Sequence, residues 1–380
     1  MAHPINREEF RIATARQIVL TKEGCQSRRS RLLNRLAAQM DVPELVIADP
    51  IHLRYLANFH VDPFSLGAEF GGLLVIGRDE STTLYHDNRL PGSVQSAQVD
   101  RVVVVPWYDG QSAGKGRRRL ALLPALASHG GRIHDALNDP LGPTIIEAIA
   151  KLRHQKDPDE IELLRSCMRA TEAGHAWART NLHEGMTELD VYEGVFQACS
   201  TAAGKPAIVY GDFAISPGSA RRGGPPTNQV LRIGDTFILD YSVILFGYRS
   251  DFTNTLVVGG QPTSEQKRLF DACVKAMAAG ESHLKAGATC QSIYDAVRAV
   301  FAGENLADAF PHHAGHGLGL EHPEAPFIVR NSSETLVEGD VVTLEPGLYV
   351  DGVGGFRIEH NYLITARGYD RLSNHEIAFD

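Results

Sequence analysis

Residues 234–256 read GDTFILDYSVILFGYRSDFTNTL, two apolar runs of strand composition that are joined by a turn around Gly247. Runs of this kind can pair as a β-hairpin, which would bring Asp240 and Asp251 to one end of a sheet. A charged carboxylate within a buried strand is destabilising unless another charge compensates it. The segment therefore favours a cation held by both acids, with two structural Asp residues that cap turns as the alternative.

A second segment, FPHHAGHGLGLEHPEAP at residues 310–326, combines glycines with four histidines. Glycine allows the backbone to approach a ligand closely, and imidazole nitrogen binds transition metals. This composition favours a metal or substrate site, although a surface loop with incidental histidines would have a similar composition.

Two further acids interrupt apolar runs of strand composition, Glu345 in DVVTLEPGLYV and Glu359 in FRIEHNYLIT. With Asp240, Asp251 and one histidine they form an Asp, Asp, His, Glu, Glu set. Such a set suits two divalent cations that are bridged by carboxylates, and its oxygen-rich character favours Mn, Co, Fe or Zn. We therefore predict a dinuclear metal centre.

The chain of 380 residues is long enough for two domains, each with its own hydrophobic core. Its first part alternates the strand-like runs ELVIADP, FGGLLVIG, TTLYHD and RVVVVPW with the helical stretches SRRSRLLNRLAAQM and RRRLALLPALASHG. We expect an α/β domain over residues 1–148, which ends near the Pro-containing stretch HDALNDPLGP.

The remaining residues, 149–380, predict an α+β domain with an antiparallel sheet covered by helices. Apolar positions recur at helical spacing over residues 145–182, and the break at LysAspPro indicates two consecutive helices, the second capped by Asp157 to Asp159. Residues 187–204 and 264–287 have the pattern of two further amphipathic helices.

Composition excludes several classes of function. The formal net charge of -9 disfavours a nucleic-acid partner, because phosphate binding needs a basic surface. No apolar run approaches the roughly 20 residues of a membrane span, so we expect no membrane contact. An odd number of scattered cysteines without a CxxC pair disfavours a disulfide framework and fits a reducing cytoplasm. They are Cys25, Cys167, Cys199, Cys273 and Cys290.

Taken together, these motifs resemble the superfamily of methionine aminopeptidase, aminopeptidase P, prolidase and creatinase, whose catalytic domain has the pita-bread fold. The stretch DPIHLRYLANF is similar to the strand and turn that open the smaller domain of prolidase-like members, and KLRHQKDPDEIELLRSCMRATEAG resembles the helices that open their catalytic domain. Because the resemblance extends over both halves of the chain, it implies the two-domain prolidase and aminopeptidase P branch. Members of this branch are commonly homodimers.

The resemblance also assigns roles. The implied metal ligands are Asp240, Asp251, His316 of the GHG motif, Glu345 and Glu359. Glu345 would also accept a proton from the attacking water, His312 would bind the substrate carbonyl or stabilise the tetrahedral intermediate, and Arg357 would orient the Glu359 carboxylate. The candidates for substrate binding are His322, Arg222 and Tyr248.

The sequence departs from the peptidase pattern at two histidine positions. Pro323 stands where a second substrate-binding histidine is expected, with His322 displaced by one residue. Gly223 or Gly224 stands where a third is expected, and glycine cannot transfer a proton. Loss of such a group typically lowers a rate by about 10²-fold or more, which weakens the assignment of Xaa-Pro peptidase activity.

Three functions stay open. The first is a dinuclear metal-dependent hydrolase of the Xaa-Pro aminopeptidase or dipeptidase kind, which cleaves an amide bond with a metal-activated water. The second is a non-peptidase hydrolase or lyase of a small nitrogenous or anionic metabolite. Arg221 and Arg222 can bind an anionic group, or they are exposed loop cations. The third, a catalytically silent binding protein, is disfavoured by the complete ligand set. The expected partner is therefore a short peptide or another small molecule.

Overall fold

The computed structural model describes residues 19–38, 44–60, 71–89, 94–111, 113 and 116–379. These residues form two compact units, one that ends at Arg153 and one that begins at His154. The expected boundary at residue 148 lies inside helix α6 (Gly142–Leu152). The division therefore falls after this helix, because its apolar residues Ile145 and Ile149 are fully buried in the first unit.

The N-terminal unit contains a four-stranded sheet in the order β1-β2-β3-β4. Neighbouring strands are antiparallel except for β3 and β4, which pair in parallel. All four expected strands are present, as β1 (Glu44–Ile47), β2 (Gly72–Gly77), β3 (Thr82–Asp87) and β4 (Arg101–Val105). A core cluster that includes Val46, Leu73 and Val75 packs on one face of this sheet.

The helices of this unit differ in part from the expectation. The two expected helical stretches form α2 (Lys22–Ala37) and the pair η1 (Arg118–Leu122) and α5 (Leu123–Ser128). The stretch DPIHLRYLANF, expected as a strand and turn, instead forms helix α3 (Pro50–Ala57). Asp49 caps this helix by accepting hydrogen bonds from the backbone N–H groups of Ile51 and His52, and Pro50 occupies its first position.

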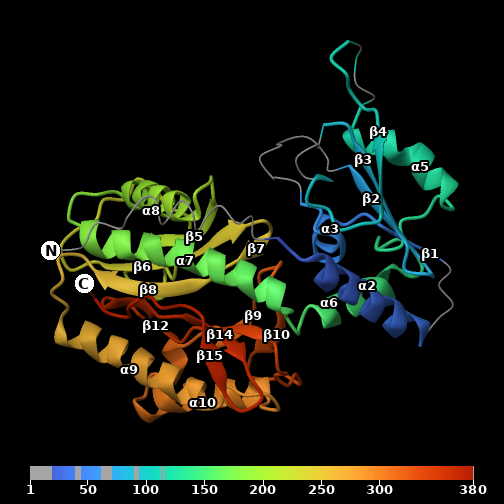
Figure 1. Cartoon of the computed structure of the whole chain (residues 1–380). Helices are drawn as coiled ribbons and strands as arrows, with labels where there is room; N and C mark the ends of the chain where they lie inside the picture. Colours follow the sequence, from blue (N-terminus) through green and yellow to red (C-terminus); the bar gives the residue numbers. More distant parts are fainter. Residues whose placement is uncertain are drawn as a thin grey trace. The chain divides into compact units, whose positions relative to one another are not determined.

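The C-terminal unit has the pita-bread architecture predicted from its sequence. Its first half is an antiparallel sheet of β5 (Ile208–Ile215), β6 (Thr236–Leu245), β7 (Tyr248–Arg249) and β8 (Phe252–Val257). Figure 1 shows α7 (Pro158–Asn181) and α8 (Glu188–Ala203), in green, on the outer side of this sheet. Asp157 and Glu160 form the capping box that starts α7, as its sequence predicts.

The second half of this unit repeats the arrangement of strands covered by helices. Its five-stranded sheet has the order β10-β9-β11-β14-β15. Figure 1 shows α9 and α10, in orange, on the side of these strands that faces away from α7 and α8. The elements are α9 (Ser264–Glu281), α10 (Cys290–Gly303), η2 (Ala307–Ala309), β9 (Gly315–Gly317), β10 (Glu324–Ile328), β11 (Val341–Leu344), β14 (His360–Ile364) and β15 (Tyr369–Arg371), with a separate pair, β12 (Gly347–Val350) and β13 (Gly354–Arg357).

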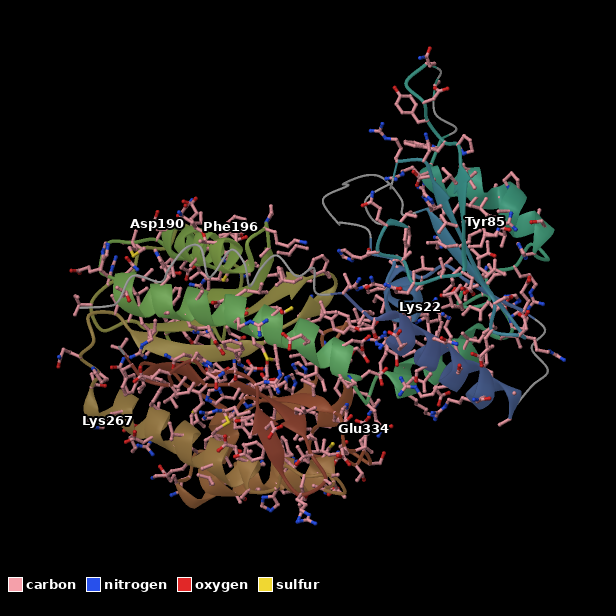
Figure 2. All side chains as sticks on the ribbon, in the orientation of Figure 1. Lys22, Tyr85, Asp190, Phe196, Lys267 and Glu334 are labelled. Atoms are coloured by element: carbon pink, nitrogen blue, oxygen red, sulfur yellow. The ribbon has the colours of Figure 1, made fainter. Side chains whose placement is uncertain are left out.

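Side chains fill the layer between strands and helices in this unit (Figure 2). A continuous core joins α9 and α10 to the strands, with Met277, Val297 and Leu344 among its buried members. The labelled Lys267 lies on the exposed face of α9. All five cysteines are free and buried. Over the part of the chain that is described, the helices lack the length and apolar character needed to cross a membrane.

Candidate metal centre

The β6–β8 hairpin places the two predicted Asp ligands on one face of a sheet. Asp240 of β6 lies opposite Thr253 of β8, and the same register puts Asp251, the residue before β8, opposite Ser242. Side chains alternate between the faces of a strand, so Asp240, Ser242 and their partners point to the same side. The hairpin expected from the sequence is confirmed.

His316 reaches this site from the middle of β9, which is held very close to both neighbouring strands. A Cβ on Gly315 would lie 2.1 Å from the carbonyl oxygen of Thr343, and a Cβ on Gly317 would lie 2.1 Å from that of Ala325. We expected these glycines to allow the backbone to approach a ligand. They are instead required because strands pack against both sides of His316.

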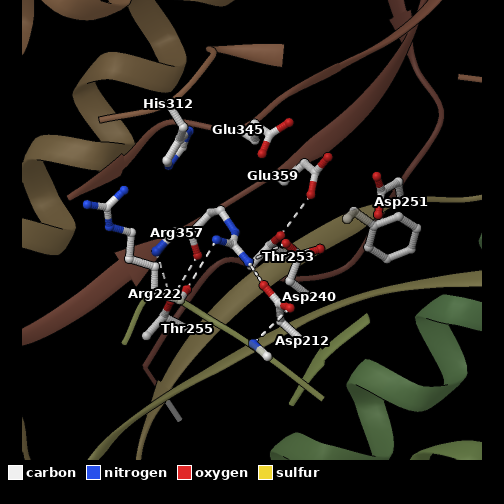
Figure 3. Close-up of polar contacts among 12 residues, drawn as sticks. Asp212, Arg222, Asp240, Asp251, Thr253, Thr255, His312, Glu345, Arg357 and Glu359 are labelled. Atoms are coloured by element: carbon white, nitrogen blue, oxygen red, sulfur yellow. Dashed lines mark hydrogen bonds and ion pairs between the residues drawn. The ribbon is translucent and has the colours of Figure 1, made fainter. Parts of the chain in front are cut away.

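The five predicted ligands converge. Carboxylate oxygens of Asp240, Asp251 and Glu359 lie within 4.8 Å of one another. The Nε2 atom of His316 lies 3.6 Å from Asp251 Oδ2 and 3.5 Å from Glu345 Oε1. Figure 3 shows the four carboxylates around a common space. Asp251 belongs both to the all-carboxylate group and to a group with His316, which fits a ligand shared by two ions.

The electrostatics of the site fit a bound cation. Glu359 is 1% exposed, and within the described part of the chain its Oε1 atom has no hydrogen-bond partner. Burial, together with the charges of Asp251, Glu345 and Asp240, raises the pKa of Glu359 well above its ordinary value. Burial also raises the pKa of Asp240 to about 7. Divalent ions would add positive charge beside both carboxylates and would give Glu359 Oε1 a partner.

Arg357 does not orient Glu359 as expected. Its Nη2 atom lies 2.5 Å from Asp240 Oδ2 and 2.6 Å from Asp212 Oδ2. Glu359 instead accepts a hydrogen bond of 2.7 Å from the hydroxyl of Thr253. The reason is the sheet register, because Asp212 of β5 lies directly opposite Asp240 and the two carboxylates together attract the guanidinium. Figure 3 shows Arg357 between these groups.

Asp212 is a site residue that the sequence analysis missed. Its Oδ1 atom accepts a hydrogen bond of 2.9 Å from the backbone N–H of Gly224. A Cβ built on Gly223 would lie 1.9 Å from Asp212 Oδ2, so this carboxylate occupies the space of a side chain at position 223. The structure therefore leaves no room for a side chain at position 223, one of the two positions, 223 and 224, at which the third family histidine was expected. The side chain of Asp212 is 33% exposed.

A chain of hydrogen bonds links Arg357 to His312. Arg357 Nη1 donates to the hydroxyl oxygen of Tyr349 at 2.8 Å, and that hydroxyl lies 3.2 Å from His312 Nε2. His312 Nδ1 lies 2.7 Å from the carbonyl oxygen of His313, which can accept a hydrogen bond from it. Burial lowers the pKa of His312 to about 4, so the imidazole is neutral at pH 7.

Two further histidines contact the predicted ligands. His313 Nε2 lies 3.0 Å from Glu345 Oε1, and His322 Nε2 lies 2.6 Å from Asp251 Oδ2. Burial opposes ionisation of Glu345, but the hydrogen bond and charge of His313, with those of neighbouring imidazoles, hold its pKa well below the ordinary range. His313 carried no specific prediction, and only its place beside His312 in the glycine-rich segment marked it.

The other candidates for substrate binding have different surroundings. Tyr248 is fully buried and donates a hydrogen bond of 2.9 Å to Glu160 of α7, so the expectation that it lines the site is wrong. Arg221 pairs with the buried Glu188 at 2.7 Å. Arg222 is exposed, and its guanidinium lies 5.9 Å from the ring centre of Tyr349. Figure 3 labels both Arg222 and His312.

The fold and the converging Asp, Asp, His, Glu, Glu set agree with a metal-dependent peptidase, the class that the family comparison shows. Residues 162–366 match the model of metallopeptidase family M24, and the chain belongs to this family.

Curated relatives are peptidases without a stated substrate. The chain is 30% identical over 233 residues to an uncharacterized peptidase of Staphylococcus aureus (strain USA300), a match that covers 60% of this chain and 65% of the relative. It is 32% identical over 245 residues to the uncharacterized peptidase YqhT of Bacillus subtilis (strain 168), covering 64% and 67%. The chain thus spans about two thirds of the length of the curated relatives that it matches.

Solved structures share the fold at low sequence identity. The prolidase from Pyrococcus horikoshii OT3 has a TM-score of 0.74 at 22% identity, over 93% of this chain and 100% of that chain. An Xaa-Pro dipeptidase from Bacillus anthracis has a TM-score of 0.74 at 23% identity, over 92% and 99%. A His243Ala aminopeptidase P from Escherichia coli has a TM-score of 0.68 at 19% identity, over 93% and 95%.

Proposed function

We propose that this protein is a dinuclear metal-dependent hydrolase that cleaves the amide bond of Xaa-Pro dipeptides or short peptides. The observation that carries the proposal is the convergence of five buried or partly buried ligands with Asp251 common to two groups. Two divalent ions held there would lower the pKa of a bound water and polarise a substrate carbonyl. Membership of family M24 and the likeness to prolidase and Xaa-Pro dipeptidase structures support this assignment.

The residues around the centre have separate tasks in this proposal. Glu345 is ionised at neutral pH because its pKa is lowered, so it can accept the proton of the attacking water. His312 is neutral and lies beside Tyr349, and this pair would hydrogen-bond the substrate carbonyl or the tetrahedral intermediate. Arg357 holds Asp240 in place and links it to Tyr349.

Metal content and turnover of Asp240→Ala and Glu359→Ala test the centre directly. We expect both variants to lose metal and activity on a panel of Xaa-Pro dipeptides with added Mn²⁺ or Co²⁺. Glu338→Ala, which changes an exposed acid on a loop, is the matched control and should keep both. Full metal occupancy in both ligand variants would show that the ligand assignment is wrong.

A second candidate function is hydrolysis, or a lyase reaction, of a small nitrogenous or anionic metabolite that is not a peptide. The partly exposed carboxylate of Asp212 beside Gly223 favours it, because this group, which also pairs with Arg357, gives the site a polar contact that differs from an imidazole. Arg222 stays a candidate contact for an anionic group of either substrate class. A metal-loaded protein that turns over no Xaa-Pro dipeptide but does hydrolyse small amides would favour this candidate.

The proposal extends to the setting of the enzyme. We propose that it works in the reducing cytoplasm, because all five of its cysteines are free thiols. The family resemblance further suggests a homodimer. Of the metals that suit the ligand set, Mn²⁺ is a natural choice for the group formed by Asp240, Asp251 and Glu359, which offers only oxygen.

A further inference from the structure

Two imidazoles approach the same carboxylate oxygen in the metal centre. His322 Nε2 lies 2.6 Å from Asp251 Oδ2, and His316 Nε2 lies 3.6 Å from that atom. The ligand atoms of these three residues lie within 4.8 Å of one another. The two rings meet edge to face, with centroids 4.9 Å apart and planes at 84°. An ion bound by Asp251 and His316 is therefore within reach of His322.

The position of His322 is fixed by the chain on both sides. It lies in the connection between β9, which carries His316, and β10, and these strands pair with a register shift after Glu324. Glu324 accepts a hydrogen bond of 2.9 Å from Lys156, and their side chains are 8% and 1% exposed. A buried ion pair of this kind anchors the connection two residues from His322. The imidazole is therefore held at the metal centre.

Orientation of Asp251 does not require His322. The hydroxyl of Ser242 donates to Asp251 Oδ1 at 3.3 Å, and the backbone N–H of Asp251 donates to Asn361 Oδ1 at 3.1 Å. The side-chain amide of Asn361 also donates to the carbonyl oxygen of Asp251. These contacts fix the carboxylate and leave Oδ2 directed toward both imidazoles. A metal ligand explains the position of His322 better than a hydrogen-bond donor that only orients Asp251.

We propose that His322 is an additional metal ligand on the His316 side of the centre, and that this side prefers Zn²⁺ or Co²⁺ over Mn²⁺. The inference rests on the dinuclear centre proposed above. Imidazole nitrogen suits Zn²⁺ and Co²⁺, whereas carboxylate oxygen suits Mn²⁺. With His316 and His322 on one side and Asp240 and Glu359 on the other, the two positions differ in ligand chemistry. The centre would then hold two different ions.

The test uses the metal-free full-length protein and three forms of it: wild type, His322→Gln and His283→Gln. Glutamine keeps an N–H donor for Asp251 but removes the imidazole, and His283 is an exposed histidine outside the site. Zn²⁺ and Mn²⁺ affinities are measured by competition with a chelating dye. We expect His322→Gln to weaken Zn²⁺ binding by at least about tenfold, the lower end of what loss of a contact to a metal ligand already costs. Mn²⁺ affinity should change far less, and the control should match wild type.

Electron paramagnetic resonance of one bound Cu²⁺ equivalent gives a reading that is independent of activity. Loss of one coordinated imidazole nitrogen in His322→Gln would support the assignment. An unchanged spectrum together with an unchanged Zn²⁺ affinity would overturn it. A single coordinated imidazole nitrogen in the wild-type spectrum would also overturn it, and this measurement does not depend on whether the variant folds. Wild-type protein that binds no metal would instead overturn the proposed function itself. Metal binding by wild type with no effect of His322→Gln would overturn only this inference.

Discussion

Replacing Glu359 by Gln should have opposite effects on the metal-free and the metal-loaded protein. Glu359 is 1% exposed, and burial together with three neighbouring carboxylates raises its pKa well above 4.5. The metal-free fold therefore keeps this carboxyl protonated to a higher pH than the unfolded chain does. Gln has nearly the same shape and is always neutral. We predict that Glu359→Gln makes the metal-free protein more stable.

An upper limit on the stability gained by the variant follows from the difference between pH 7 and the ordinary pKa of a glutamate side chain. Keeping the carboxyl protonated up to pH 7, 2.5 units above its ordinary value of 4.5, costs at most about 3.4 kcal/mol. The folded state binds more protons than the unfolded state, so the contribution of Glu359 to stability is greatest below pH 4.5 and falls as the pH rises. The advantage of the variant should therefore vanish near pH 4.5 and grow toward pH 7.

With bound metal, we expect wild type to be more stable than Glu359→Gln. An ion that binds only the folded state at 100 times its Kd stabilises it by about 2.7 kcal/mol, and Gln is a poor ligand that forfeits much of this gain. Urea unfolding with chelator and with excess Mn²⁺, at several pH values, measures both effects. Glu338→Gln on an exposed loop is the control and should change stability by less than about 0.5 kcal/mol. A metal-free Glu359→Gln variant that is less stable than wild type at pH 7 would refute the reasoning.

Three further predictions concern the surroundings of the site. Gly223→Ala should destabilise the protein by about 1–3 kcal/mol, because the methyl group would displace Asp212, and urea unfolding should show a much smaller loss in an Asp212→Ala background. Tyr248→Phe should lower stability by about 1–3 kcal/mol through its lost contact with buried Glu160, but turnover per folded molecule should be unchanged. His375 has a pKa lowered by burial to about 4, so stability should fall as the pH drops below 6.5, where the unfolded state takes up the proton. The stability of His375→Gln, followed by thermal unfolding from pH 7 to pH 4, should fall less steeply than that of wild type.

The ligand set could be predicted because each acidic ligand can be recognised from the residues next to it in the sequence. An acid within or directly beside an apolar strand is unusual enough to indicate a cation. Asp240 lies within β6, and Asp251, Glu345 and Glu359 each adjoin the end of a strand. The alternation of side chains along a strand also indicates the face of the sheet to which Tyr248 points. Tyr248 pairs with Leu245, which lies an odd number of residues from Asp240 along β6. Its side chain must therefore point to the face covered by α7.

The partners of Arg357 could not be predicted, because they depend on which strands lie side by side. Asp212 is remote in sequence and reaches the site only through the register of β5 on β6. The carboxylate beside Gly223 is likewise a tertiary effect, since nothing in the local sequence of Gly223 indicates that Asp212 lies there. The helix at Pro50–Ala57 could have been predicted, because Asp49 followed by Pro50 is a capping signal. The family resemblance instead suggested a strand and turn there.

Strand β9 also sets where this enzyme can be redesigned. Even alanine at Gly315 or Gly317 would drive a methyl group into a carbonyl oxygen of an adjacent strand. Substitutions at these two positions beside His316 are therefore not tolerated. The connections at residues 220–224 and 319–323 border the same chemistry outside the regular strands. A combinatorial library confined to these two connections, with Gly223 and His322 kept, could explore new substrates while the scaffold that presents His316 stays intact.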